Sequence, residues 1–149
     1  MAKLPRSVLV LVHTSDAVLL LERLQPAGFW QSVTGSLEPG EDWEDAARRE
    51  LEEETGFPAE GLVDTGVRNL FPILPPWRDR YPADVRDNEE RVFTLALSKQ
   101  HRPRLQPAEH RAFAWLTPLE AARRCSSATN RDAILRQFHR VLDVRSLAS

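Results

Sequence analysis

The stretch Gly35–Phe57, GSLEPGEDWEDAARRELEEETGF, decides most of what this chain folds into and does. Because an α-helix turns by about 100° per residue, side chains three and four positions apart lie on one face. Glu50, Glu53 and Glu54 therefore form one acidic patch, whereas Glu52 points almost the opposite way. Like charges within one turn repel each other, so this patch is either a well-solvated face or the site of a bound cation.

The residues around the patch predict a helix over Asp42–Thr55 between two loops. Asp42 is suited to be the N-cap, and Gly56 is suited to the left-handed position that ends a helix. Gly35 and Gly40 bracket the preceding loop, where the backbone must bend sharply or approach a ligand closely. The carboxylates are therefore expected on the rigid part of the segment.

The same run also fits a longer spaced pattern, G-x5-E-x7-R-E-U-x-E-E-x-G-U, in which U is apolar. This pattern is the Nudix box, and the chain resembles the Nudix hydrolases. The resemblance implies an α/β chain with the Nudix fold, an α/β/α sandwich around a mixed β-sheet. It also implies cleavage of a nucleoside diphosphate linked to another group, with Mg²⁺ or Mn²⁺. Carboxylates and water are the ligands that Mg²⁺ prefers, and such an ion neutralises pyrophosphate charge and activates water.

Length and composition limit the alternatives. The 149 residues suit one domain, 1–149, with a sizeable core. The net charge of -2, without a basic stripe, argues against a nucleic-acid duplex, and no apolar run is long enough to cross a membrane. The single cysteine, Cys125, excludes an intramolecular disulfide and fits the cytoplasm. The expected partner is a small phosphorylated molecule, and the oligomeric state stays open.

Apolar runs and turn residues predict the other elements. Strands are expected at Ser7–His13, Ala17–Arg23, Phe29–Thr34, Leu62–Asn69, Glu90–Ser98 and Arg111–Leu116. Thr117 is expected to cap a helix over Pro118–Arg123, and Thr129 or Asn130 to cap a final helix that runs to about Val144. This order favours a mixed sheet with helices on both faces.

The segment Phe71–Asp84 contains four prolines and is expected to be irregular. Long irregular segments inside compact domains are often functional, so this one is either a lid or a static wall.

Several runs outside the box resemble, over nearly the whole chain, the subfamily of bacterial Nudix enzymes that hydrolyse dihydroneopterin triphosphate in folate biosynthesis. These runs are FWQSVTGSLEPGE, RDNEERVFTLAL, AEHRAFAWL and SSATNRDAI. The implied products are dihydroneopterin monophosphate and pyrophosphate. Two alternatives stay open: a Nudix pyrophosphohydrolase acting on (d)NTPs or dinucleoside polyphosphates, and a non-catalytic Nudix-fold module that binds a nucleotide-like ligand. The complete set of carboxylates argues against the second.

The resemblance implies roles for particular residues. Metal ligands are expected at Glu50, Glu53, Glu54 and Glu109, and catalytic roles at Arg49, Glu53 and Glu109, with Glu53 or Glu109 as the base. Substrate contacts are expected at Lys3, Arg23, Thr34, Phe71, Pro72, Ile73, Leu74 and Ser127. Cations offset the charge of a triphosphate, and apolar side chains can cover a flat pterin ring.

Two neighbours of these residues have competing interpretations. Arg49 either pairs with Glu41 and orients the loop or lies on the surface as an ordinary arginine. His110, next to Glu109, either titrates near neutrality beside the site or, as expected of most such histidines, is a surface imidazole.

Overall fold

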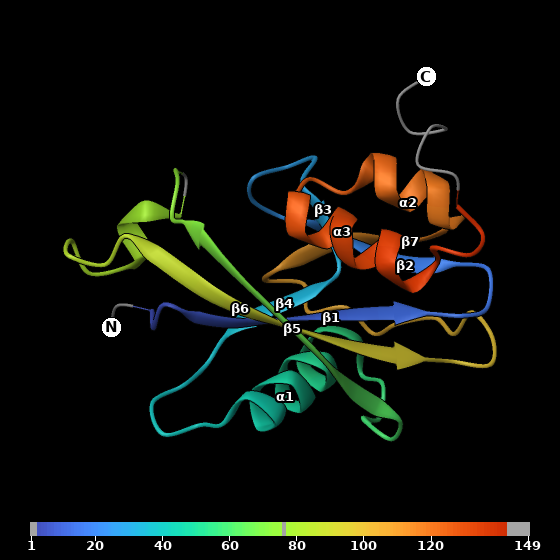
Figure 1. The fold of residues 1–149 in the computed structure, drawn as a ribbon, viewed down its shortest axis with the longest axis horizontal. Coiled ribbons are helices and arrows are strands. Elements are labelled where there is room, and N and C mark those ends of the chain that lie inside the picture. Colours follow the sequence, from blue (N-terminus) through green and yellow to red (C-terminus); the bar gives the residue numbers. More distant parts are fainter. Residues whose placement is uncertain (1–2, 76, 143–149) are drawn as a thin grey trace.

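The computed structural model describes residues 3–75 and 77–142, which form three layers. The helix α1 (Trp43–Thr55) lies on one face of a β-sheet. The helices α2 (Pro118–Arg124) and α3 (Ala128–Gln137) cover the other face (Figure 1). The expected α/β/α arrangement is confirmed.

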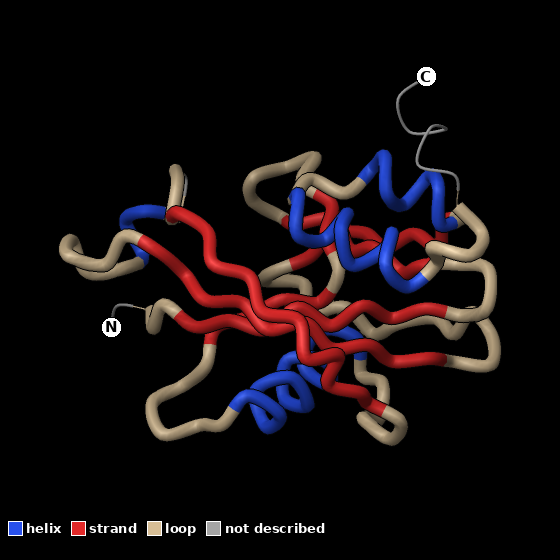
Figure 2. Tube along the Cα trace, viewed as in Figure 1, coloured by secondary structure: helices blue, strands red, loops and turns tan. Residues whose placement is uncertain are grey.

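The sheet contains seven strands from the described residues (red in Figure 2). They are β1 (Arg6–His13), β2 (Val18–Arg23), β3 (Trp30–Gln31), β4 (Val33–Ser36), β5 (Leu62–Pro72), β6 (Asp87–Ala96) and β7 (His110–Leu116). The strand order is β3-β2-β1-β6-β5, with β4 paired to β1 and β7 paired to β2. Since β1 runs parallel to β6 but antiparallel to β2 and β4, the sheet is mixed, as expected.

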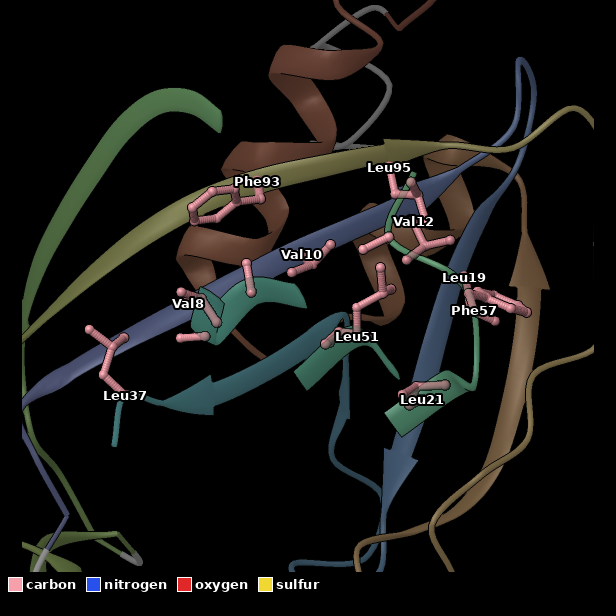
Figure 3. Packing of buried hydrophobic residues seen from close by; sticks show 14 residues of the cluster. Val8, Val10, Val12, Leu19, Leu21, Leu37, Leu51, Phe57, Phe93 and Leu95 are labelled. Atoms are coloured by element: carbon pink, nitrogen blue, oxygen red, sulfur yellow. The ribbon is translucent and has the colours of Figure 1, made fainter. Parts of the chain in front are cut away.

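The strand β1 is buried on both faces and separates two apolar cores. The core on the α1 side includes Val8, Val10, Val12, Leu51 and Phe93 (Figure 3). The core on the α2 and α3 side includes Leu9, Leu11, Val92 and Ile134. A strand covered on both faces reads as a continuous apolar run, which is why SVLVLVH does not alternate with polar residues.

Both ends of α1 lie where the sequence predicts. The Asp42 carboxylate accepts a hydrogen bond of 2.8 Å from the backbone N–H of Asp45. Gly56 adopts the left-handed conformation, with φ of 75°, and its N–H donates to the carbonyl oxygen of Glu52 at 2.8 Å.

The predicted cap of the last helix was wrong. Ser127 is the N-cap, and its hydroxyl accepts from the N–H of Asn130. Asn130 is instead buried inside α3, where its side chain accepts from the N–H of Ser32 at 2.7 Å. The helix α3 ends at Gln137, and Val144 lies outside the described residues.

The segment Phe71–Asp84 is more ordered than predicted. Its first two residues belong to β5, where Phe71 pairs with Asn88. A short 3-10 turn follows at Arg78–Arg80. Pro72 is tolerated because β5 is the edge strand of the sheet order.

Among the described residues, none of the helices combines the length and the apolar character that a membrane crossing requires.

The packing of α1 on the sheet generates a first prediction. Leu51 is fully buried in the core on the α1 side, so Leu51→Ala is expected to lower the free energy of unfolding by roughly 2–5 kcal/mol. Urea denaturation measures this loss, and Glu52→Ala, on the exposed side of the same helix, is the control. A loss for Leu51→Ala no larger than that for Glu52→Ala would contradict the packing described here.

Candidate active site

The acidic face of α1 is largely buried. Ala46, Ala47 and Leu51 pack against the sheet, and this packing turns the side of the helix that carries Glu50 and Glu54 inward. As a result only 8% of Glu50 and 0% of Glu54 is exposed, while Glu53 remains about half exposed. For Glu50 and Glu54 the alternative of a well-solvated face is therefore wrong.

Gly35 on β4 creates the space that the Glu50 carboxyl group occupies. A Cβ atom at position 35 would overlap the Glu50 carboxyl carbon and both of its oxygens. Any residue with a side chain at this position would have to displace that carboxyl group. The first glycine of the motif is thus explained by the close approach of a side chain.

Arg49 holds the loop before α1 in place. Its Nε and Nη2 atoms donate to both carboxylate oxygens of Glu41, at 2.8 and 2.9 Å, which confirms the predicted pairing. Nη2 also donates to the carbonyl oxygen of Ser36 at 3.0 Å, and Nη1 donates to Glu50 at 2.7 Å and to Glu53 at 3.4 Å. The bond from Arg49 lowers the pKa of Glu41, and the bond to Glu41 raises the pKa of Arg49. The alternative of an ordinary surface arginine is wrong.

Within the described residues, neither oxygen of the buried Glu54 carboxyl group forms a close hydrogen bond, although the backbone N–H of Thr34 and the His110 Nε2 atom, at 3.7 Å, lie beside it. Burial raises the pKa of Glu54 well above its usual range, and the adjacent Glu50 carboxyl group raises it further. Burial likewise raises the pKa of Glu50. Two desolvated carboxyl groups beside each other form an environment that a cation would stabilise.

Residues from a distant part of the chain complete this cluster. Glu109, just before β7, and His110, the first residue of β7, each bring a ligand atom near Glu54. The ligand atoms of these three residues lie within 4.8 Å of one another, close enough to share one metal ion. Glu53 is not part of this group, and its carboxylate pairs with Arg49 instead.

The expectation that His110 is a surface imidazole was wrong. Only 2% of His110 is exposed, and its Nε2 atom lies 3.7 Å from a carboxylate oxygen of Glu54. Burial, with a smaller effect of Arg23, lowers the pKa of His110 to about 4, so the ring is neutral near pH 7. The register of β2 shifts at Arg23, which pairs with His110. No sequence pattern indicated this shift.

Cationic side chains line the pocket that opens next to the carboxyl groups. Lys3 and Arg23 lie there as expected, together with Arg80, which sequence reasoning missed. Burial lowers the pKa values of Lys3 and Arg23, and the charge of Arg80 lowers both further. The backbone N–H of Lys3 donates to the carbonyl oxygen of Arg80 at 2.7 Å, which ties the chain start to the 3-10 turn. The only sequence signal for Arg80 was its place in the proline-rich segment.

One pocket of about 1190 Å³ is lined by every site residue predicted from sequence except Glu54, which is fully buried. All eight expected substrate contacts line it: Lys3, Arg23, Thr34, Phe71, Pro72, Ile73, Leu74 and Ser127. Arg49, Glu50, Glu53 and Glu109 line it as well. Trp77 also lines this pocket. Its ring centroid lies 5.0 Å from that of Phe29 in an edge-to-face arrangement, and the Arg23 guanidinium lies above its ring. The arrangement places a carboxylate cluster and a group of cations in one space large enough for a nucleotide-sized ligand.

Known proteins resemble this chain along most of its length. The model of the NUDIX domain matches residues 3–138. Dihydroneopterin triphosphate diphosphatase of Escherichia coli K12 is 39% identical over 138 residues, which cover 89% of this chain and 91% of the relative. The enzyme of that name from Haemophilus influenzae is 34% identical over 135 residues, which cover 87% of this chain and 84% of the relative.

Solved structures agree with these matches. The structure of the E. coli dihydroneopterin triphosphate pyrophosphohydrolase superposes with a TM-score of 0.85 at 37% identity, covering 91% of this chain and 96% of the other. The resemblances to the Nudix hydrolases and to this subfamily are confirmed, and so is the Nudix fold. With the family model matching most of the chain and relatives this similar, the chain belongs to the Nudix hydrolase family.

Proposed function

We propose that this enzyme hydrolyses dihydroneopterin triphosphate to dihydroneopterin monophosphate and pyrophosphate in a reaction that requires Mg²⁺. The observation that carries the proposal is one pocket in which buried carboxyl groups face a group of cations, beside apolar side chains suited to a flat ring. The relatives named dihydroneopterin triphosphate diphosphatase support the choice of substrate. A cytoplasmic setting fits the free thiol of Cys125.

The residues present fit a divalent cation. Glu54 offers two buried oxygens that form no close hydrogen bond within the described residues, and Glu50 and Glu109 lie beside it. We assign Glu50, Glu54 and Glu109 as the ligands, with Glu53 at the edge of the set and the neutral ring of His110 close enough to Glu54 and Glu109 to bind the same ion. An oxygen-rich ligand set suits Mg²⁺ and also accepts Mn²⁺. The bound cation would neutralise charge on the phosphates and activate a water molecule.

The side chains around this cluster have distinct roles in the proposal. Arg49 holds Glu50 and Glu41, and so fixes the carboxyl groups against the glycine loop. Lys3, Arg23 and Arg80 bind the phosphate oxygens and stabilise charge that develops in the transition state. The two candidate bases both line the pocket, Glu109 near Glu54 and Glu53 near Arg49.

The ring of the substrate is assigned to the apolar wall of the pocket. Phe71 and Ile73 lie at the end of β5 and just beyond it, and Trp77 follows in the proline-rich segment. Thr34 and Ser127 add hydroxyl groups to the lining of the same pocket. A flat heterocycle between such surfaces gains both apolar burial and aromatic contact.

Substrate preference tests the proposed function most simply. Specificity constants for dihydroneopterin triphosphate, 8-oxo-dGTP, dATP and diadenosine tetraphosphate, compared with Mg²⁺ present, are expected to be highest for the pterin. Pyrophosphate should be released in the presence of Mg²⁺, and its release should stop when the metal is chelated. A clear preference for the dinucleoside polyphosphate or for dATP would instead support the alternative Nudix activities.

The unpaired carboxyl group of Glu54 leads to a prediction about stability. Its raised pKa means that metal-free folding becomes progressively less favourable as the pH rises above the usual value of 4.5. Glu54→Gln should therefore raise the melting temperature of the metal-free protein, increasingly so toward alkaline pH, while abolishing most turnover.

Added Mg²⁺, in contrast, should raise the stability of the wild type more than that of the Glu54→Gln variant. At a concentration of roughly 100 Kd it is expected to stabilise the wild type by about 2.7 kcal/mol and the variant much less. Thermal unfolding with and without Mg²⁺ measures both effects, with Glu52→Gln as the control. Equal stabilisation of wild type and Glu54→Gln would exclude Glu54 as a ligand.

Arg80 provides a test of the phosphate-binding assignment. Arg80→Ala is expected to raise the KM for the triphosphate by roughly tenfold, because one charged hydrogen bond is lost, and to leave the fold intact. Arg86→Ala, an exposed arginine outside the pocket, removes the same charge and serves as the control. Steady-state kinetics give the KM of both variants. Equal KM values for Arg80→Ala and Arg86→Ala would contradict a role of Arg80 in phosphate binding.

A further inference from the structure

The pocket has an inner end formed by two polar residues of β6 that neither the metal nor the phosphates require. Asn88 and Glu90 are 3% and 5% exposed, and both line the pocket. They alternate along β6 with Val92, which packs in the core beside α3, so all three share one face of the sheet. Arg91, on the opposite face, lies over Trp43 of α1.

Glu90 is a buried carboxyl group with only neutral partners. Asn69 donates to its Oε1 atom at 3.2 Å, and the Thr129 hydroxyl is its other hydrogen-bond partner. Burial raises the pKa of Glu90, and no cation of the described part of the chain counteracts this. A buried carboxyl group in this situation gains from any further N–H donor that a ligand brings.

Asn88 adds an acceptor at the same end of the pocket. Its Nδ2 atom donates to the Ser7 hydroxyl at 2.8 Å. Its Oδ1 atom is buried and has no donor among residues 3–75 and 77–142. Buried polar atoms normally have partners, so an unpaired oxygen in a pocket wall indicates a group missing from the protein alone. The inner end therefore presents hydrogen-bond acceptors on Asn88 and Glu90, which suit a ligand with adjacent hydrogen-bond donors.

The sheet register places this end at a suitable distance from the phosphate site. Ser7 of β1 pairs with Ser36 of β4 on one side and with Glu90 of β6 on the other. Neighbouring strands lie about 4.8 Å apart, so the backbones at Glu90 and Ser36 are roughly 10 Å apart across β1. Phe71 pairs with Asn88 and shares its face, which puts an aromatic side chain beside the acceptors.

We propose that Glu90, with Asn88 beside it, binds the 2-amino-4-oxopyrimidine edge of the substrate ring. The two oxygens of the Glu90 carboxylate accept hydrogen bonds from the ring N–H and from the exocyclic amino group, in a bidentate arrangement. The Asn88 Oδ1 atom accepts from the second hydrogen of that amino group. Phe71 covers the face of the ring. Glu90 is thus the residue that determines specificity for the heterocycle.

This arrangement discriminates between heterocycles by their donors. The pterin ring of dihydroneopterin and the guanine ring both present an N–H next to an amino group. Adenine and cytosine present a ring nitrogen acceptor at the corresponding position. That nitrogen would face a Glu90 carboxylate oxygen, and neither atom would have a donor. The inference rests on the proposed function, because a substrate held by its phosphates near Glu54 extends its ring toward Glu90.

The test compares Glu90→Gln with Glu89→Gln, a neighbour on the opposite face of β6 that pairs with Arg91. The amide of Gln replaces one acceptor with a donor that opposes the N–H groups of the ring. Specificity constants are measured for dihydroneopterin triphosphate, dGTP and dATP. Binding of neopterin, which carries no phosphate, is measured by its fluorescence in the absence of metal.

Glu90→Gln is expected to lower the specificity constants for dihydroneopterin triphosphate and dGTP by roughly 10- to 100-fold, mostly through KM, and to weaken neopterin binding similarly. The constant for dATP should not fall, and Glu89→Gln should leave all values within about twofold. A purely structural role of Glu90 would lower all three constants together, and that result, or unchanged neopterin binding, would overturn the inference.

The inference and the proposed function fail in different ways. If the wild type prefers dATP or a dinucleoside polyphosphate, the proposed function fails whatever the variant does. If the wild type prefers the pterin and Glu90→Gln keeps that preference, only the assignment of Glu90 fails.

Discussion

Glu50 and Glu54 of α1 are carboxyl groups buried against the β-sheet, and the arrangement of the rest of the site follows from this burial. Removing such groups from water is costly unless they gain partners. Arg49 is a partner for Glu50, whereas neither oxygen of Glu54 has a hydrogen-bond partner among the described residues. Gly35 leaves space for the Glu50 carboxyl group and Leu51 anchors the helix, so the fold holds the charged form of Glu54 in an environment that a bound cation would stabilise.

The pocket next to these carboxyl groups has three chemically different parts. Carboxyl groups gather beside β4, the cations Lys3, Arg23 and Arg80 lie at the proline-rich segment, and acceptors lie at the inner end on β6. A phosphorylated substrate with an N–H-rich ring has groups that match all three. The parts come from distant segments of the chain. The strand β1 pairs with β6, which carries the inner end, on one side and with β4, which carries Gly35, on the other.

The sequence predicted best where local chemistry determines structure. Asp42 and Gly56 fix the ends of α1 through their own conformational preferences, so the helix and its acidic face could be derived directly. The cap of α3 was harder, because Ser127, Thr129 and Asn130 are all competent caps and only the tertiary bond from Ser32 to Asn130 distinguishes them. Burial of His110, and the approach of Arg80 to Lys3 and Arg23, depend on strand register and on a loop path that no local pattern encodes.

Anomalous diffraction from crystals soaked in Mn²⁺ shows whether the carboxyl cluster at Glu54 holds a divalent cation. An anomalous peak is expected about 2.1 Å from a carboxylate oxygen of Glu54, with Glu50 or Glu109 as a further ligand. A fully occupied Mn²⁺ elsewhere in the pocket, or no peak at Glu54 with a non-hydrolysable substrate analogue bound, would contradict this assignment.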